Sequence, residues 1–255
     1  MPDSVESGTV FHPLKESSFQ FGCHRGIECF TKCCADLKLV LTPYDILRMK
    51  RRLELRSDVF LDRYTDTRLE PDFRFPRVIL KMRDDDRRTC PFVTTDGCSI
   101  YEDRPGACRI YPLGRASMVL EDGKGKVSKE KFFIVREKHC LGFSEGRRWT
   151  PEEWMENEGL GEYNRLNDQW QEILTSSKNL GNADEIPRKI QMFFMASYNL
   201  DRFREFIFRS RFLSLFEVNP SEREDIASDD TALLHFAFRW LKFSLYGEGT
   251  IKMKA

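Results

Sequence analysis

Eight cysteines are the residues of this chain best suited to chemistry, and all of them lie in the first 140 of its 255 residues. They are Cys23, Cys29, Cys33, Cys34, Cys90, Cys98, Cys108 and Cys140. Thiolate is a soft ligand that suits zinc, copper(I) and iron–sulfur clusters, and zinc and iron–sulfur sites commonly take four such ligands. Eight thiols can therefore fill two such sites, or one polynuclear site with thiols to spare. We predict that these cysteines are metal ligands that converge in space, and that they hold an iron–sulfur cluster or zinc.

A disulfide framework is the other general use of so many cysteines. Disulfide scaffolds are typically short secreted chains that cannot build a core, whereas this chain has 255 residues and 21 phenylalanines. Residues 1–18 have no basic region followed by an apolar stretch, so no secretory signal is expected. No apolar run approaches the roughly 18–20 residues of a membrane span. We therefore expect a cytoplasmic protein with reduced thiols, with structural disulfides and inert buried thiols as the alternatives.

The spacing of the cysteines bears on which metal they hold. Zinc ribbons and fingers usually take two ligands from one C-x-x-C turn, and this chain has no C-x-x-C. Cys29 and Cys33, with three residues between them, come closest to such a pair. Cys33 and Cys34 are adjacent, and on extended backbone their side chains would point apart and serve different metal ions or positions. The spacing favours iron–sulfur, although ligation by cysteine alone also fits zinc.

Basic residues flank several of the thiols. A metal ion bound by four thiolates carries net negative charge, which nearby cations and N–H donors stabilise. Arg104 and Arg109 bracket Cys108, and we predict that these two arginines, together with Tyr101, surround the metal ligands. For Arg104, a salt bridge with Glu102 or Asp103, or a contact with a helix, is an equal alternative.

Other kinds of chemistry find less support. His24 and His139 each stand beside a cysteine, but adjacency alone favours a hydrogen-bonded histidine outside the ligand set. The sequence has no G-x-G-x-x-G, no P-loop and no H-E-x-x-H, and its four histidines suggest no Ser-His-Asp arrangement. Lysines plus arginines and aspartates plus glutamates both number 41, so no nucleic-acid partner is expected. The basic run 50–52 is interpreted as the solvated face of a helix.

Loops and short strands are expected to position the thiols. Residues 19–36 show little periodicity and are interpreted as a loop shaped by what it binds. Thr42 followed by Pro43 predicts the start of a helix, because threonine is a favoured N-cap and proline suits the first helical position. The remaining expectations are a helix over 58–64, a strand over 74–82, and two strands over 117–120 and 131–136 joined by the hairpin signal at 122–125.

From Thr150 onward the pattern changes to helices. Thr150, Pro151 and Glu153 form a capping-box sequence, and helical periodicity follows over 151–177, 185–197, 199–216 and 229–246. Aromatic residues crowd these segments, and at helical spacing they are usually core. We predict an α+β protein with a cysteine-rich metal-binding domain of short strands at 19–149, followed by a helical C-terminal domain at 150–255.

The motifs around the later cysteines carry a family resemblance. CPFV at 90–93, GCSIYEDRP at 97–105 and CRIYP at 108–112 resemble the YkgJ-like cysteine-cluster family, also called CxxCxxCC. That family joins an earlier cysteine cluster, which ends in a Cys-Cys pair, to this later motif. The earlier cluster here ends in Cys33 and Cys34 and is wider than the spacing in the family name. Further matching segments are LTPYDI at 41–46, CLG at 140–142 and WTPEEW at 149–154, so that the resemblance covers about residues 19–154.

The resemblance implies a zinc- or iron-chelating domain. Our first hypothesis is an iron–sulfur protein with a redox or cluster-dependent enzymatic role. The alternative is a zinc-stabilised module whose helical domain binds a partner, in which the thiolates supply only folding energy. A second alternative is a protein lysine methylase, because a related group includes the flagellin lysine methylase. The partner, a protein or a small molecule, is not identified by the sequence.

Overall fold

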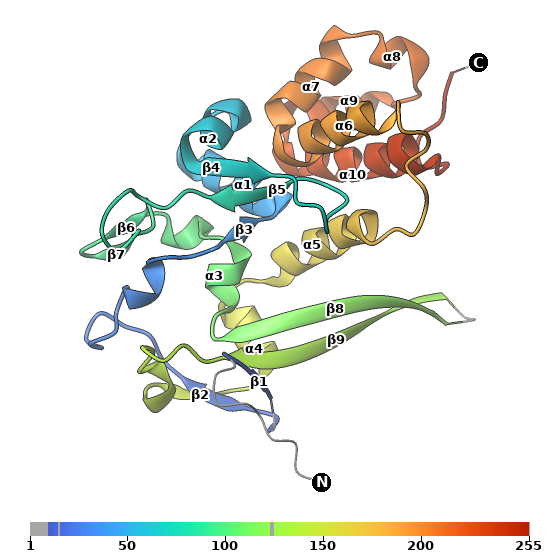
Figure 1. The fold of residues 1–255 in the computed structure, drawn as a ribbon. Coiled ribbons are helices and arrows are strands. Elements are labelled where there is room, and N and C mark those ends of the chain that lie inside the picture. Colours follow the sequence, from blue (N-terminus) through green and yellow to red (C-terminus); the bar gives the residue numbers. More distant parts are fainter. Residues whose placement is uncertain (1–9, 15, 123–124, 255) are drawn as a thin grey trace. The chain divides into compact units, whose positions relative to one another are not determined.

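The computed structural model describes residues 10–14, 16–122 and 125–254. The chain divides into two compact units, and each unit is made of two chain segments. Unit 1 comprises the residues up to Leu37 together with Met82–Tyr163, and unit 2 comprises Lys38–Lys81 together with the residues from Asn164 on. Figure 1 shows the elements of both.

The α+β class is confirmed, because short strands in small sheets are combined with helices that are mostly C-terminal. The division into units differs from the sequential one expected at 149/150. Residues 38–81 pack with the C-terminal helices and leave the cysteine segments on either side of them to form unit 1. The sequential division stays a prediction about independently folding domains.

Unit 1 is built from short strands and turns. Its elements are β1 (Phe11–Pro13), β2 (Phe19–Phe21), the 3-10 turn η1 (Lys32–Cys34), β6 (Val93–Thr94), β7 (Gly97–Cys98), η2 (Tyr101–Asp103), α3 (Gly106–Ile110), β8 (Leu113–Asp122), β9 (Gly125–Val135), η3 (Gly142–Ser144), β10 (Arg147–Trp149) and α4 (Pro151–Asn157). The predicted hairpin is confirmed as the long antiparallel pair β8–β9, with β1 on its other edge (Figure 1). The two middle residues of the predicted hairpin link lie outside the described residues.

A small aromatic core holds the two ends of the cysteine-rich segment together. Phe19, Phe21, Leu113 and Trp154 form a buried cluster, and the ring of Trp154 meets that of Phe21 edge-on at 5.6 Å. Strand β10 pairs antiparallel with β2, and the Trp149 indole donates a hydrogen bond to the Phe21 carbonyl at 3.0 Å. The strand that leads into Cys23 is thereby fixed against the segment that follows Cys140.

Unit 2 combines a three-stranded sheet with helices. Its elements are β3 (Val40–Leu41), α1 (Pro43–Arg52), α2 (Ser57–Tyr64), β4 (Thr65–Arg68), β5 (Arg77–Leu80), α6 (Ile186–Tyr198), α7 (Leu200–Arg209), α8 (Phe212–Leu215), α9 (Pro220–Ser228) and α10 (Asp230–Tyr246); helix α5 (Gly161–Leu174) begins at its border with unit 1. The sheet order is β3-β5-β4. Helices α1 and α2 pack against α10 and α7, which follow them by more than a hundred residues (Figure 1).

Local sequence signals explain where most of these helices begin and end. Thr42 caps α1 and Thr150 caps α4, each with the predicted proline and a full capping box. The single helix predicted over 151–177 is broken because Gly159 has a positive φ of 61° after the end of α4. The helix predicted over 199–216 is broken at Ser210, whose backbone is extended. The predicted aromatic core is confirmed, with Phe203 and Phe236 among the fully buried side chains.

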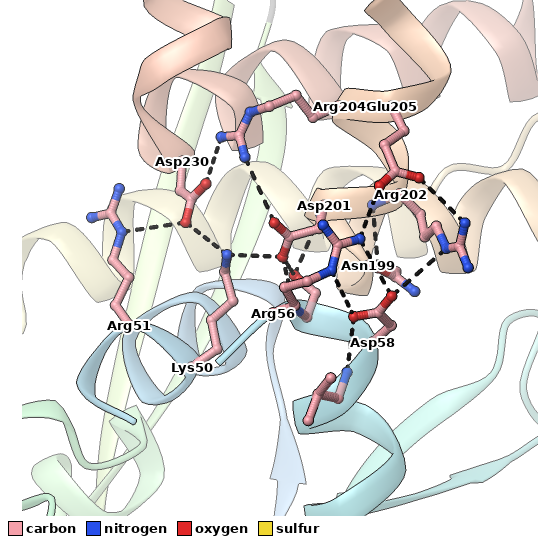
Figure 2. Close-up of polar contacts among 12 residues, drawn as sticks. Lys50, Arg51, Arg56, Asp58, Asn199, Asp201, Arg202, Arg204, Glu205 and Asp230 are labelled. Carbon is pink, nitrogen blue, oxygen red and sulfur yellow. Dashed lines mark hydrogen bonds and ion pairs between the residues drawn. The ribbon is translucent and has the colours of Figure 1, made fainter. Parts of the chain in front are cut away.

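A buried cluster of charges lies among α1, α2, α7 and α10 of unit 2 (Figure 2). The Lys50 ammonium lies 3.1 Å from one carboxylate oxygen of Asp201 and 2.8 Å from one of Asp230. Arg204 donates to the other oxygen of Asp230 at 2.5 Å, and Ser57 donates to Asp201 from its amide and its hydroxyl. The prediction that residues 50–52 form a solvated helix face is wrong for Lys50, whose side chain is only 6% exposed. The two carboxylates that pair with its ammonium compensate the cost of burying this charge.

Candidate metal centre

The first four cysteines lie on a series of tight turns that follows β2. Each turn is closed by a backbone hydrogen bond of 2.9–3.1 Å. The Ile27 amide donates to the His24 carbonyl, the Phe30 amide to the Ile27 carbonyl and the Lys32 amide to the Cys29 carbonyl. This local hydrogen bonding replaces a regular element between Cys23 and Cys34, in agreement with the loop interpretation. It brings several thiols onto one short stretch of backbone, and Cys29 is the buried one among them.

The adjacent pair Cys33–Cys34 differs from expectation. The two residues lie in the 3-10 turn η1 and not on extended backbone, because the Cys34 amide donates to the Thr31 carbonyl at 2.9 Å. With three residues per turn, adjacent side chains in such a turn are about 120° apart, not opposite. The Cys34 thiol therefore reaches the Cys33 sulfur, and the hydrogen bond that it donates lowers the pKa of Cys33 to about 7. The same contact raises the pKa of Cys34.

Cys140, the most isolated cysteine in the sequence, lies beside the first cluster. The amide of Leu141 donates a hydrogen bond to the Cys29 sulfur at 3.2 Å. One residue further on, the Gly142 carbonyl accepts from the Gly22 amide at 3.0 Å. Backbone contacts thus fix the Cys140 segment to the turns that carry Cys29 and to the strand that precedes Cys23.

Cys23 shares this neighbourhood. Partial loss of solvation, together with negative charge on Cys33, Cys29 and Cys140, raises the pKa of Cys23 to about 11, while the charge of Arg104 opposes the shift. Four thiols that lie within electrostatic reach of one another are costly to ionise without a cation among them. This is the electrostatic situation that a bound metal ion would reverse.

The later cysteines meet the first cluster at Cys34. The Cys90 amide donates to the Cys34 carbonyl at 2.8 Å, and an isolated antiparallel bridge joins Ala35 to Thr89. The charges of Cys33, Cys90 and Cys108 all contribute to the raised pKa of Cys34. Cys90 therefore lies beside the Cys-Cys pair, although more than fifty residues, most of them in unit 2, separate them in the sequence.

Cys90 and Cys98 lie on the small hairpin β6–β7, in which Val93 pairs with Cys98. Burial raises the pKa of both thiols. Backbone amides partly offset this effect, since Phe92 and Val93 donate to the Cys90 sulfur and Ile100 donates to the Cys98 sulfur. N–H donors to sulfur stabilise thiolate and orient it, as in metal–thiolate sites.

Arg104 reaches the thiols electrostatically, and its predicted place around the metal ligands stays a prediction. The guanidinium is buried, donates to the Tyr101 carbonyl at 2.7 Å and stacks over the Tyr101 ring at 3.7 Å. Its charge lowers the pKa of Cys23 and of Cys98. Its ion-pair partner is Glu158, the C-cap residue of α4, so the contact is with a helix, as one alternative had it.

Arg109 has a different surrounding. It donates to the backbone carbonyls of Glu158 and Glu102, and its guanidinium lies over the Tyr163 ring at 5.2 Å. These contacts fix α3, which carries Cys108, to the start of the helical segment. Arg109 thus positions the backbone around Cys108, and its predicted place around the metal ligands stays a prediction.

Tyr111 is a candidate that we did not single out from the sequence. Its hydroxyl is buried and makes no hydrogen bond of good geometry, although the Cys140 thiol lies next to it. Burial raises the pKa of Tyr111, and the charges of Cys140 and Cys33 raise it further. The CRIYP motif contains this tyrosine, but a tyrosine within a motif gives no sign of which way its hydroxyl points.

The two histidines beside cysteines have their own surroundings. The Nδ1 atom of His24 accepts a hydrogen bond from the Gly26 amide at 3.1 Å, and its Nε2 atom lies 3.7 Å from the Glu145 carboxylate. His139 is exposed. The sulfur atoms therefore remain the ligands expected at this site.

The donor set fits a thiolate-bound metal. All eight cysteines are free thiols, backbone amides already donate to the sulfurs of Cys29, Cys90 and Cys98, and an unpaired buried hydroxyl lies at Cys140. Within the described part of the chain, no three histidine, cysteine, aspartate or glutamate side chains are placed to hold one ion as they stand. The described arrangement is thus one of neighbouring thiols and not of a closed coordination shell. That the eight cysteines are the ligands stays a prediction.

Comparison with known proteins places this geometry in a family. Residues 22–141 match the sequence model of the CxxCxxCC family, described as a "putative zinc- or iron-chelating domain". This is the family that the motifs around the later cysteines resemble. The matched range begins one residue before Cys23 and ends one residue after Cys140, so the segment that is similar to the CxxCxxCC domain contains all eight cysteines. The family supports zinc or iron as the bound metal, in agreement with the cofactor expected from the thiols. Neither the curated proteins nor the solved structures gave a match.

The helices of the structure test one further expectation, that the chain has no membrane span. Among the described residues, no helix is both long and apolar enough to cross a membrane. The cytoplasmic location and the unidentified protein or small-molecule partner stay predictions from the sequence.

Proposed function

We propose that the segment similar to the CxxCxxCC domain holds iron–sulfur centres on its cysteines and has a redox or cluster-dependent enzymatic role. The observation that carries this proposal is the combination of an all-sulfur donor set with solvent access. Cys23, Cys33 and Cys108 are exposed while the other five cysteines are buried or half-buried. A centre that exchanges electrons with a partner or meets a substrate has to lie near the surface, and the exposed thiols allow this; a structural zinc site needs no such access, because four protein ligands complete its coordination shell.

The surrounding residues would tune such a centre. Hydrogen bonds to the sulfurs and nearby charge set the reduction potential of an iron–sulfur cluster. The amides of Leu141, Phe92 and Ile100 would stabilise the thiolates they already contact, and the buried cation Arg104 would offset their negative charge. When bound, the cluster itself supplies the electron transfer.

The test is the iron, zinc and acid-labile sulfide content of protein prepared without oxygen. We expect iron and sulfide in near-equal amounts and brown protein. Stoichiometric zinc without sulfide in the anaerobic preparation would overturn the proposal. Protein prepared in air serves as the comparison, because loss of iron can leave zinc in the same thiolates.

A zinc-stabilised interaction module is the second candidate, and one observation favours it. The turn after Cys90 directs two amides, those of Phe92 and Val93, at a single sulfur. A tight turn that presents a thiolate together with its own N–H groups is typical of half a zinc knuckle. Zinc content that survives anaerobic preparation, with no redox activity, would favour this function. Lysine methylation has no described residue in its favour and is not carried further.

A further inference from the structure

The eight thiols fall into two groups when only contacts of the chain are considered. In the first group, the amide that follows Cys140 donates to the Cys29 sulfur at 3.2 Å. Cys33 follows Cys29 through a turn closed by the Lys32 amide on the Cys29 carbonyl at 3.0 Å. Cys23 comes directly after Gly22, whose amide is bonded to the Cys140 segment at Gly142. Three short chain segments thus bring four thiols together.

The second group forms on the other side of the Cys-Cys pair. The Cys90 amide donates to the Cys34 carbonyl at 2.8 Å. Cys98 pairs in β7 with Val93, whose amide donates to the Cys90 carbonyl at 3.2 Å. Cys108, in α3, is the one of the eight cysteines that these contacts leave unassigned, and it would complete a second set of four, the usual number of thiolates at such a site.

We propose that Cys23, Cys29, Cys33 and Cys140 form one four-thiolate site, and that Cys34, Cys90, Cys98 and Cys108 form a second. Each site takes one zinc ion or one iron–sulfur cluster. The inference rests on the metal binding proposed above, which it extends by assigning the ligands. Four thiolates are the usual complement for either kind of centre.

The turn at the Cys-Cys pair joins the two groups, because Cys33 and Cys34 are adjacent residues of η1. The two sites are therefore neighbours, and a single polynuclear site on all eight thiols is the arrangement that a test has to separate from them.

Metal content of cysteine variants separates these arrangements. Cys140→Ser removes a ligand of the first site and Cys98→Ser a ligand of the second, and we expect each to lose about half of the iron plus zinc bound per chain. Cys29→Ser combined with Cys140→Ser should lose no more than Cys140→Ser alone. Cys98→Ser combined with Cys140→Ser should lose nearly all. His139→Gln, beside Cys140 but outside the ligand set, is the matched control and should keep full content.

Other outcomes overturn the partition. If each single variant loses all of its metal, the eight thiols form one joint site. If the double variant within the first site loses far more than the single one, Cys29 and Cys140 belong to different sites. If the protein without substitutions binds no metal at all, the proposed function and the partition are both refuted. This outcome is seen before any variant is made.

A second measurement needs no variant and so does not depend on whether a variant folds. Protein from which about half of the metal has been removed by a chelator is alkylated, and the half-loaded form is analysed by mass spectrometry. Protected cysteines should occur as one of the two proposed sets of four. Protection of mixed sets, such as Cys23 with Cys90, would overturn the assignment.

Discussion

Unit 2 buries aromatic side chains against one another and pairs its one deeply buried ammonium, whereas unit 1 gathers eight thiols around a small core. In unit 2, Phe203 and Phe236 are fully buried and their rings lie 6.4 Å apart, and Lys50 lies between two carboxylates. In unit 1, burial and neighbouring thiols raise the pKa of Cys23, and the buried Tyr111 hydroxyl lacks a good partner. The comparison teaches that the buried charges around Lys50 in unit 2 are neutralised by other side chains of the chain, whereas neighbouring thiols such as those of unit 1 are costly to ionise without a cation among them.

Metal removal should therefore act on one unit. We expect a chelator, added under reducing conditions without oxygen, to abolish amide protection in 22–36 and 89–110 and to leave 200–209 and 230–246 protected. Metal binding to an unstructured site is folding free energy, on the order of 10 kcal/mol for structural zinc. Hydrogen exchange read by mass spectrometry measures both units in one sample.

The segment 43–64 makes this experiment sharper. It belongs to unit 2 by packing, but to the cysteine-rich domain by the sequential division at 149/150. Continued protection of 43–64 after chelation would favour the packing division. Loss of protection in this segment together with the cysteine turns would favour the sequential one, and equal loss in both units would mean that the protein folds as one cooperative whole.

The buried charge cluster should matter most to unit 2. Lys50→Met leaves two carboxylates without their shared cation, and breaking a buried pair in this way costs roughly 3–5 kcal/mol. Arg51→Met, at the next position of α1, removes a side chain that is 42% exposed, and exposed pairs contribute about 0–1 kcal/mol. Urea unfolding followed by far-ultraviolet circular dichroism compares the two variants. Equal losses would mean that the cluster contributes no more than surface pairs do.

The sequence predicted local features well and long-range assembly poorly. Capping boxes at Thr42 and Thr150 and the β8–β9 hairpin follow from nearby residues, and each is found as expected. Asn219 and Pro220 carried the same kind of signal for α9, which was overlooked. Lys50 was misjudged because its partners lie about 150 and 180 residues away, and no local pattern reports them.

The candidate metal centre shows the same limit, because residue types could be predicted from the sequence but their arrangement could not. The eight cysteines could be picked out by residue type alone, and Arg104 by its charge near Cys108. The turn at Cys33–Cys34 and the grouping of thiols depend on backbone hydrogen bonds between distant segments, such as the one from Cys90 to Cys34. Tyr111 could not be found from the sequence, because its importance comes from the burial of one hydroxyl beside Cys140.

Acid should weaken unit 2 through the same cluster. Burial alone would raise the pKa of Asp230, but hydrogen bonds and charge from Lys50 and Arg204 lower it to about 2. The unfolded value is about 3.9, so the stabilisation is present above about pH 4 and is lost as the pH falls toward 2, which amounts to about 2–3 kcal/mol. Hydrogen exchange of α7 and α10 between pH 5 and pH 2.5 should show a shallower dependence in Asp230→Asn. Parallel curves would contradict the assignment.

The smallest effect concerns the buried hydroxyl of Tyr111, which has no good partner among the described residues. In the metal-loaded domain we expect the Tyr111 hydroxyl to donate to the Cys140 thiolate, because it is buried and has no other partner of good geometry. Tyr111→Phe keeps the ring that meets Phe21 edge-on at 5.8 Å and removes only the hydroxyl. Loss of such a hydrogen bond next to a ligand typically weakens metal binding about 10-fold or more. Competition for zinc against a chromophoric chelator measures the change.

Tyr101→Phe, on a tyrosine that is 55% exposed, is the control and should change the affinity less than about twofold, given the small net value of an exposed hydrogen bond. A larger effect at Tyr101 than at Tyr111 would restore the choice made from the sequence and would remove Tyr111 from the surroundings of the metal.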